Sequence, residues 1–176
     1  MLDLYVDFDG VILNTIDITY MKIEDAGISF NEAEKIEKFY EELDWVSLFD
    51  ESRPIKDSLN NLKKLMDSEL FNVSVLSHVN SDSEAKAKRE YLAKNVPGLK
   101  VIPVKITTNK CDAVDCKNAI LVDDYMGNLE LWDRKGGVSV KFSDKGKKYK
   151  FITISDLDML FDKYDEIREL IEIKDN

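Results

Sequence analysis

The fold is decided by the stretch Met1-Leu-Asp-Leu-Tyr-Val-Asp7-Phe-Asp9-Gly10-Val-Ile-Leu-Asn-Thr15. Its apolar residues 4–6 are typical of a short buried strand, and two carboxylates, Asp7 and Asp9, follow directly. Residues two apart on extended backbone point to the same side, so these carboxylates repel each other unless a cation or a shared proton intervenes. Gly10 permits a turn and lets the backbone approach a ligand closely. The stretch predicts either a ligand site or an acidic turn after a strand.

The composition indicates one packed domain, with or without an inserted piece. The chain has 176 residues, of which 44% are hydrophobic and 10% aromatic. The formal net charge of −10 argues against the broad basic face of a nucleic-acid binder. No apolar stretch is long enough to span a membrane, and no signal peptide is visible. Cys111 and Cys116 match neither a CxxC pair nor a zinc site, so we interpret them as two plain thiols, which fit a cytoplasmic protein. His78 is the only histidine.

Strand-like and helix-like segments alternate along most of the chain. Strands are expected near residues 73–76, 101–104, 119–122, 138–142 and 151–154. Helices are expected near residues 59–66, 82–95, 110–116 and 129–134, and after a cap at Ser155. This alternation predicts an α/β fold with a doubly wound, mostly parallel, Rossmann-like sheet. Pro103 indicates that its strand lies at an edge or is irregular.

Residues 14–53 interrupt this alternation and look helical. One predicted helix covers residues 17–25, and a second begins after Asn31 as N-cap, with Glu34 three residues on. The second helix has an apolar stripe made of Ala33, Ile36, Phe39, Tyr40 and Leu43. We therefore divide the chain into a core, residues 1–13 and 54–176, and a small helical insertion. Trp45 and Phe49 are expected to pack the insertion on the core, with stacking on a base as the alternative.

Three of the apolar strands end in polar side chains. Asp7 and Asp9 follow the first, Ser77 the second, and Asp123 and Asp124 a later one. Ligands of open parallel sheets bind at the carboxyl ends of the strands, so these side chains are predicted to converge on one crevice. Four carboxylates need a counter-charge, and a hard, oxygen-preferring cation such as Mg²⁺ fits them.

A lysine near these carboxylates would complete a phosphate site. Lys110, which precedes the last of the three strands, is our candidate, and Lys105 is its rival. Lys86 and Lys88 look like surface residues. A lysine-rich run over residues 141–150 is interpreted as a solvated hairpin loop, with binding of an anionic substrate as the alternative. The glycine-rich fingerprints of dinucleotide and P-loop sites are absent.

These motifs resemble those of the haloacid dehalogenase (HAD) superfamily of phosphohydrolases. Its first motif, DxDx followed by Thr or Val and an apolar residue, matches residues 7–12. Its second motif matches Ser77, its third is a lysine, and its fourth matches the pair Asp123-Asp124. Residues 107–132 look similar to the 5′(3′)-deoxyribonucleotidase branch, in which a lysine, a strand, two aspartates and an Asn-Leu helix follow in that order. The resemblance covers the whole core and implies that residues 14–53 form a cap.

The resemblance also implies roles for the residues. Asp7 would be the nucleophile that accepts the phosphoryl group as an aspartyl-phosphate. Asp9 would protonate the leaving oxygen and then deprotonate the attacking water. Mg²⁺ would be held by Asp7, the backbone carbonyl of Asp9 and Asp123, with Asp124 as a further ligand or an outer partner. The phosphate would be held by Ser77, Lys110 and the backbone N–H groups of residues 8–10, Gly10 included.

We therefore expect an enzyme, a Mg²⁺-dependent phosphatase that hydrolyses a small phosphomonoester, with a nucleoside or deoxynucleoside monophosphate as one candidate. Sugar phosphates and polynucleotide ends are alternative substrates, although the acidic charge disfavours long nucleic-acid contacts. A non-catalytic phosphoaccepting or binding module is the remaining alternative. In receiver domains of that kind the acidic pair comes first along the chain, and an acid/base such as Asp9 is not needed.

Overall fold

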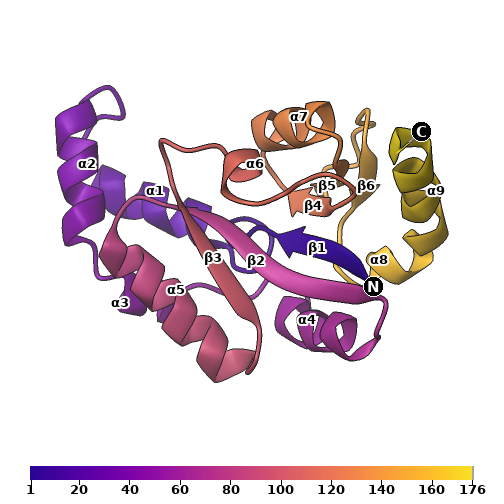
Figure 1. The fold of residues 1–176 in the computed structure, drawn as a ribbon. Helices are drawn as coiled ribbons and strands as arrows, with labels where there is room; N and C mark the ends of the chain where they lie inside the picture. Colours follow the sequence, from indigo (N-terminus) through magenta and orange to yellow (C-terminus); the bar gives the residue numbers. More distant parts are fainter. Residues whose placement is uncertain (176) are drawn as a thin grey trace.

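The structure is a computed structural model, and it describes residues 1–175. Over these residues the strands form one parallel sheet in the order β3-β2-β1-β4-β5-β6 (Figure 1). Their bounds are Leu2–Val6 (β1), Phe71–Val79 (β2), Lys100–Lys105 (β3), Ile120–Asp123 (β4), Val138–Phe142 (β5) and Ile152–Ile154 (β6). The predicted doubly wound α/β fold is confirmed, and Pro103 lies in an edge strand, where its missing N–H leaves no gap in the sheet's interior.

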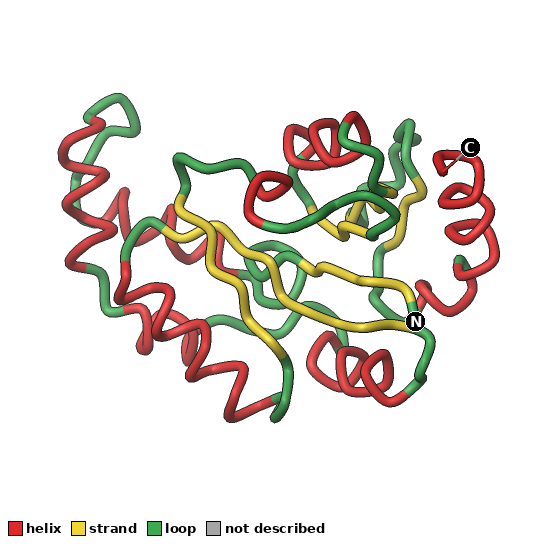
Figure 2. The backbone as a smooth tube through the Cα atoms, in the orientation of Figure 1, coloured by secondary structure: helices red, strands yellow, loops and turns green. Residues whose placement is uncertain are grey.

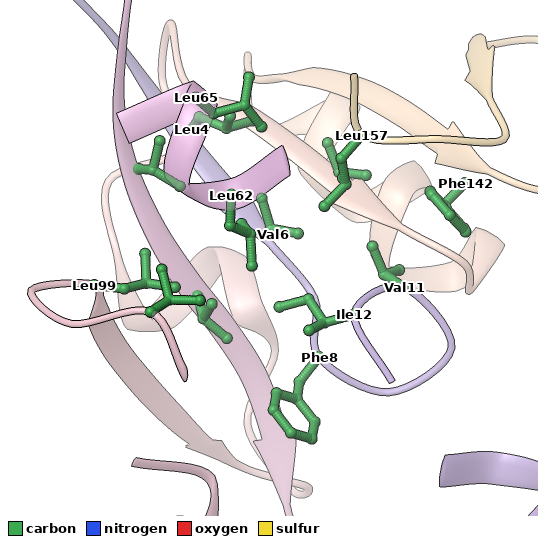
Figure 3. Close-up of a cluster of buried hydrophobic side chains, with 14 of the residues drawn as sticks. Leu4, Val6, Phe8, Val11, Ile12, Leu62, Leu65, Leu99, Phe142 and Leu157 are labelled. Atoms are coloured by element: carbon green, nitrogen blue, oxygen red, sulfur yellow. The ribbon is translucent and has the colours of Figure 1, made fainter. Parts of the chain in front are cut away.

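Helices cover both faces of the sheet (Figure 2). The core helices are α4 (Ser58–Asp67), α5 (Asp82–Asn95), α6 (Lys110–Ala113), α7 (Met126–Arg134), α8 (Met159–Asp162) and α9 (Tyr164–Asp175). Alternate residues of each strand face opposite sides. Leu4 and Val6 therefore join the cluster under α4, α5 and α9, which Figure 3 shows, whereas Tyr5 packs in the smaller cluster under α6 and α7. Because both faces are covered, the central strands carry apolar residues on both sides, as Leu4, Tyr5 and Val6 of β1 show.

The segment between β1 and α4 folds as three helices, α1 (Thr15–Asp25), α2 (Ala33–Glu42) and α3 (Trp45–Glu51). Helix α3 packs on the core as expected: Phe49 is buried with its ring centre 5.1 Å from that of Phe8, and Trp45 is also buried. Helix α2 lies at the outer edge of the molecule, away from the sheet, and has no fully buried residue (Figures 1 and 2).

Several local expectations are wrong. The N-cap of α2 is Glu32 rather than Asn31, and the Glu32 carboxylate accepts a hydrogen bond from the Ser29 N–H (3.0 Å). Strand β2 continues past the expected end because Ser77 and His78 still pair with β3. The lysine-rich run is not a hairpin, since β5 and β6 are parallel. Its first member, Lys141, is a buried residue of β5, while the later lysines of the run are exposed.

No helix within residues 1–175 combines the length and the apolar character that crossing a bilayer requires.

A test of the packing around the turn after α7 concerns Gly137. A Cβ there would overlap the Trp132 indole and lie 2.7 Å from Cys116 O, so Gly137→Ala is expected to lower the free energy of unfolding by roughly 2 to 3 kcal/mol. Gly27→Ala serves as the comparison, because Gly27 has φ +68° and open space around it, and should lose only about 1 kcal/mol. Urea unfolding measures both, and equal losses would contradict the collision.

Candidate active site

The sheet order brings Asp7 and Asp123 together. They stand at the carboxyl ends of β1 and β4, which are neighbours, and the Asp7 N–H continues the pairing by donating to Val122 O (2.9 Å). Asp124 follows at once, and carboxylate oxygens of the three residues lie within 4.8 Å of one another. The predicted convergence of these side chains is therefore observed in the structure.

Lys110, rather than Lys105, is the lysine that joins this acidic cluster. It begins α6, is buried, and its Nζ lies 2.8 Å from Asp7 Oδ1 and 2.7 Å from Asp123 Oδ2. Burial lowers its pKa, but the charges of Asp123 and Asp7 outweigh burial and raise the pKa well above its ordinary value. Lys105 is exposed at the end of β3. Lys110 therefore stays charged between the two carboxylates.

Asp123 is held rigidly in this cluster. Its Oδ1 accepts a hydrogen bond from the Tyr125 N–H (2.8 Å), and its Oδ2 accepts one from Asn128 Nδ2 (2.9 Å). The sequence motifs give no individual role to Asn128, although the Asn-Leu pair in its helix is part of the resemblance. Asn128 and Lys110 approach the same oxygen, so they fix the orientation of the Asp123 carboxylate.

The remaining carboxylates of the cluster resist ionisation. Burial raises the pKa of Asp7 to about 7; Lys110 opposes this, and the negative charges of Asp123 and Asp9 add to it. Burial and the charge of Asp123 raise the pKa of Asp124 to about 6. Among residues 1–175, no hydrogen-bond donor engages Asp7 Oδ2 or the Asp124 carboxylate. Carboxylate oxygens that no donor engages fit a hard divalent cation, which would compensate their charges.

Asp9 is held apart from this cluster. Thr15 Oγ1 donates to its Oδ1 (2.6 Å), and Lys88 Nζ lies 2.6 Å from its Oδ2. Burial raises the pKa of Asp9, but the charge and hydrogen bond of Lys88, with the hydrogen bond from Thr15, outweigh burial and hold the pKa below its ordinary value. The two carboxylates of the first motif, two residues apart, thus have opposite pKa shifts and separate partners.

The expectation that Lys88 is a surface residue is wrong. Its side chain is fully buried, while that of Lys86, two residues earlier on α5, is 76% exposed. The residues of α5 that face the core include Glu84, Ala85 and Ala87. Glu84 lies four residues before Lys88, which is a sequence signal for an ion pair on one face of the helix. Lys86 and Glu90 have the same spacing on an exposed face, so this signal alone does not identify the buried side.

Ser77 and Gly10 both lie at the site. Ser77 is fully buried, and its Oγ lies 3.0 Å from Lys88 Nζ and 3.4 Å from Asp9 Oδ2. Gly10 has φ +74°, and a Cβ there would lie 2.5 Å from Asp124 Oδ2. Its N–H donates to Leu13 O (2.9 Å), so the Gly10 amide is already engaged. A glycine at this position lets the Asp124 carboxylate approach the turn closely. Phosphate binding by Ser77 and Gly10 stays a prediction.

Two cavities flank the carboxylates. The one on the side of Asp9, of about 190 Å³, is lined by aromatic rings together with a few polar groups; among its residues are Thr19, Tyr20, Tyr40, Trp45, His78 and Asn80. The one on the side of Asp124, of about 540 Å³, is lined by the cationic residues Arg53, Lys56, Lys141 and Lys145 and by the acidic residues Asp17, Asp124 and Asp144. The Lys141 ammonium donates to the backbone carbonyl of Asp124. His78 lines the cavity on the side of Asp9, and its Nε2 lies 2.9 Å from Thr108 O.

The fold is similar to that of solved hydrolases, several of which are described as haloacid dehalogenase-like. A hydrolase from Pseudomonas syringae superposes with a TM-score of 0.63 at 11% identity over 95% of this chain and 99% of its own. A HAD phosphatase from Thermococcus onnurineus superposes with a TM-score of 0.59 at 16% identity, covering 93% and 98% of the two chains. At such identities the likeness concerns the fold alone.

A third similar structure holds ligands. The D,D-heptose 1,7-bisphosphate phosphatase from B. bronchiseptica, complexed with magnesium and phosphate, has a TM-score of 0.55 at 11% identity, covering 94% and 99% of the two chains. No protein-family model matches the sequence, and no curated protein is significantly similar to it. The deoxyribonucleotidase branch is therefore not distinguished from the rest of the superfamily.

The raised pKa of Asp7 leads to a prediction about the metal-free protein. A carboxyl whose pKa rises on folding, here from 3.8 to about 7, binds its proton more tightly in the folded state, so its ionisation destabilises the fold as the pH rises through that range. At pH 8 with a chelator, Asp7→Asn should therefore raise the free energy of unfolding by on the order of 1 kcal/mol. Urea unfolding tests this, with the exposed Asp67→Asn as the control. A destabilised Asp7→Asn would contradict the prediction.

Proposed function

We propose that this protein is a phosphatase that hydrolyses a small phosphomonoester through an aspartyl-phosphate on Asp7. The observation that carries the proposal is the division of the two neighbouring carboxylates. Asp7 has one oxygen on Lys110 and one without a donor, whereas both oxygens of Asp9 are held by a separate set of donors. A nucleophile beside a positioned acid/base is the arrangement that covalent hydrolysis needs.

The proposed reaction has two steps. In the first, Asp7 Oδ2 attacks phosphorus and the bond from phosphorus to the leaving oxygen breaks. Asp9 gives a proton to that oxygen, and it would hold this proton because the negative charge of the bound phosphate raises the pKa of Asp9 from its lowered value in the free protein. In the second, Asp9 as carboxylate takes a proton from water, the water oxygen attacks phosphorus, and the bond to Asp7 breaks to release inorganic phosphate. Lys110 and Ser77 would bind the phosphoryl oxygens during both steps.

Mg²⁺ is the cofactor we propose. It would be held by the carboxylates of Asp7, Asp123 and Asp124 and by the backbone carbonyl of Asp9, and it would supply charge neutralisation for the phosphoryl oxygens. The oxygen-only donor set and the unengaged oxygens of Asp7 and Asp124 support this assignment. The magnesium and phosphate in the similar B. bronchiseptica enzyme also support it.

Residues 14–53 would act as the cap of this site, on a core formed by residues 1–13 and 54–176. Helices α1, α2 and α3 contribute Tyr20, Tyr40 and Trp45 to the cavity that Asp9 also lines. Since Asp9 protonates the leaving oxygen, the leaving group would lie in that cavity. Both cysteines are buried free thiols, which supports the reducing cytoplasm as the place of action.

The aromatic cavity favours a planar leaving group, such as a nucleoside or deoxynucleoside. Tyr40 and Trp45 lie nearly parallel, with an interplanar angle of 7° and ring centres 6.0 Å apart. The cavity on the side of Asp124 favours the alternative substrate, a sugar phosphate with a second anionic group. Arg53, Lys56 and Lys145 are exposed there and could bind that group. Polynucleotide ends are less favoured by a net charge of −10.

Phosphate release from a panel of substrates, with Mg²⁺ and with a chelator, tests the proposal. The panel holds deoxynucleoside 5′- and 3′-monophosphates, sugar mono- and bisphosphates and an aryl phosphate. We expect Mg²⁺-dependent release, and a loss of turnover of 1000-fold or more, roughly, in Asp7→Asn with the fold retained. Retained activity in that variant would contradict the mechanism. A long-lived phosphoryl adduct without turnover would instead favour a non-catalytic phosphoaccepting module.

A variant pair tests the aromatic cavity. Tyr40→Leu removes a ring that lines it, and stacking on a base contributes about 1 to 3 kcal/mol. We therefore expect KM for a nucleoside monophosphate to rise by roughly 5- to 100-fold, with little change for glycerol phosphate. Phe39→Leu, the neighbouring ring on α2 that does not line the cavity, is the control. Equal effects of Tyr40→Leu on both substrates would rule out stacking.

A further inference from the structure

Lys88 is a buried lysine whose ammonium group is surrounded by hydrogen-bond acceptors from several elements. Its side chain is 0% exposed, and its ammonium group lies within hydrogen-bond distance of several acceptors. These are Asp9 Oδ2 (2.6 Å), Glu84 Oε1 (2.7 Å), His78 O (2.8 Å) and Ser77 Oγ (3.0 Å). An ammonium group with three N–H donors is saturated by these acceptors, so its position is fixed.

Glu84 holds Lys88 from the side away from Asp9. It is 2% exposed, and its other oxygen accepts hydrogen bonds from the Asn80 N–H (2.7 Å) and Asn80 Nδ2 (3.1 Å). The glutamate is therefore anchored to the loop between β2 and α5. Since Glu84 and Lys88 lie one turn apart on α5, the helix presents an already assembled ion pair to Asp9.

This ion pair fixes the direction of the Asp9 carboxylate. Thr15 holds one oxygen and Lys88 the other, and the carboxylate borders the aromatic cavity instead of joining the acidic cluster of Asp7, Asp123 and Asp124. Without Lys88, the carboxylate would be free to turn toward any cation in that cluster.

Lys88 also acts on Ser77. By donating to Ser77 Oγ it occupies a lone pair of the hydroxyl, whose own hydrogen then has only long contacts, 3.3 Å to His78 O and 3.4 Å to Asp9 Oδ2. The hydroxyl hydrogen is thus available to a better acceptor, such as a phosphoryl oxygen.

We propose that Lys88, backed by Glu84, is a positioning residue that aims Asp9 at the leaving oxygen and presents the Ser77 hydroxyl to the phosphoryl group. Lys110 contacts the other carboxylate of the motif, Asp7, so each of the two carboxylates has its own lysine. This inference rests on the proposed phosphatase function, because it concerns the step in which Asp9 protonates the leaving oxygen.

The test exploits the chemistry of the leaving group. An alkyl phosphate such as glycerol phosphate needs a proton on its leaving oxygen, whereas an aryl phosphate such as p-nitrophenyl phosphate does not. The double variant Glu84→Gln/Lys88→Met removes both charges of the ion pair, so no glutamate is left buried and unpaired. In rapid-quench measurements of the first turnover, we expect its rate to fall about 100-fold on the alkyl phosphate and less than about 5-fold on the aryl phosphate.

Lys86→Met is the matched control, since Lys86 lies on the same helix with its side chain 76% exposed, and it should behave as wild type on both substrates. Mg²⁺ affinity by titration calorimetry should be unchanged in the double variant. Glu84→Gln alone, which keeps Lys88 but removes the charge that holds it, should show the same selective loss on a smaller scale, and its result decides the matter if the double variant does not fold.

Equal losses on the two substrates, no loss, or weakened Mg²⁺ binding would overturn the role of Lys88. No phosphate release by the wild-type protein from any member of the substrate panel would overturn the proposed function and, with it, this inference. The two failures are distinguishable, because the first is measured against an active wild-type enzyme.

Discussion

Placing several carboxylates in one buried crevice is the constraint on which the rest of the site depends. Burial and mutual repulsion oppose ionisation of Asp7 and Asp124. Two lysines that are themselves buried supply positive charge to the crevice. Lys110 bridges Asp7 and Asp123, and Lys88 binds Asp9. Each buried charge is tolerable only because its partner is fixed at short distance, so the crevice, the two helices that supply the lysines and the sheet edge form one unit.

Most of the fold could be predicted because the sequence is locally consistent with it. Apolar strands alternate with helices, and α5 occupies the predicted range, Asp82–Asn95. The strand-end aspartates could be placed together since parallel strands share an edge. The predictions that were wrong concern features set by contacts between residues distant in the chain. Strand β2 continues through His78 because β3 pairs with it. Lys141 is separated from the exposed lysines that follow it because it lies within β5.

The residues of the candidate site could be predicted only in part, because some of its contacts also depend on residues distant in the chain. Asp7, Asp123 and Lys110 follow from motif order, but the burial of Lys88 does not follow from a helix that is charged on almost every face. Which side of α5 meets the core is decided by packing against Asp9 and Ser77. The sequence contains the Glu84–Lys88 pair, and only the tertiary structure distinguishes it from the exposed pair formed by Lys86 and Glu90 on the same helix.

The placement of the two buried lysines on different helices has an evolutionary consequence. Lys110 stands on α6 and Lys88 on α5, so either charge pair can be lost by local changes while the other remains. Under the proposed mechanism, a lineage that kept Lys110 with Asp7 but lost Lys88 and Asp9 would still take a phosphoryl group from a substrate whose leaving oxygen needs no proton, but it would lack the base that activates water. Such a descendant would hold the phosphoryl group as a lasting mark, and it would differ from the hydrolase by substitutions confined to α5 and the turn after β1.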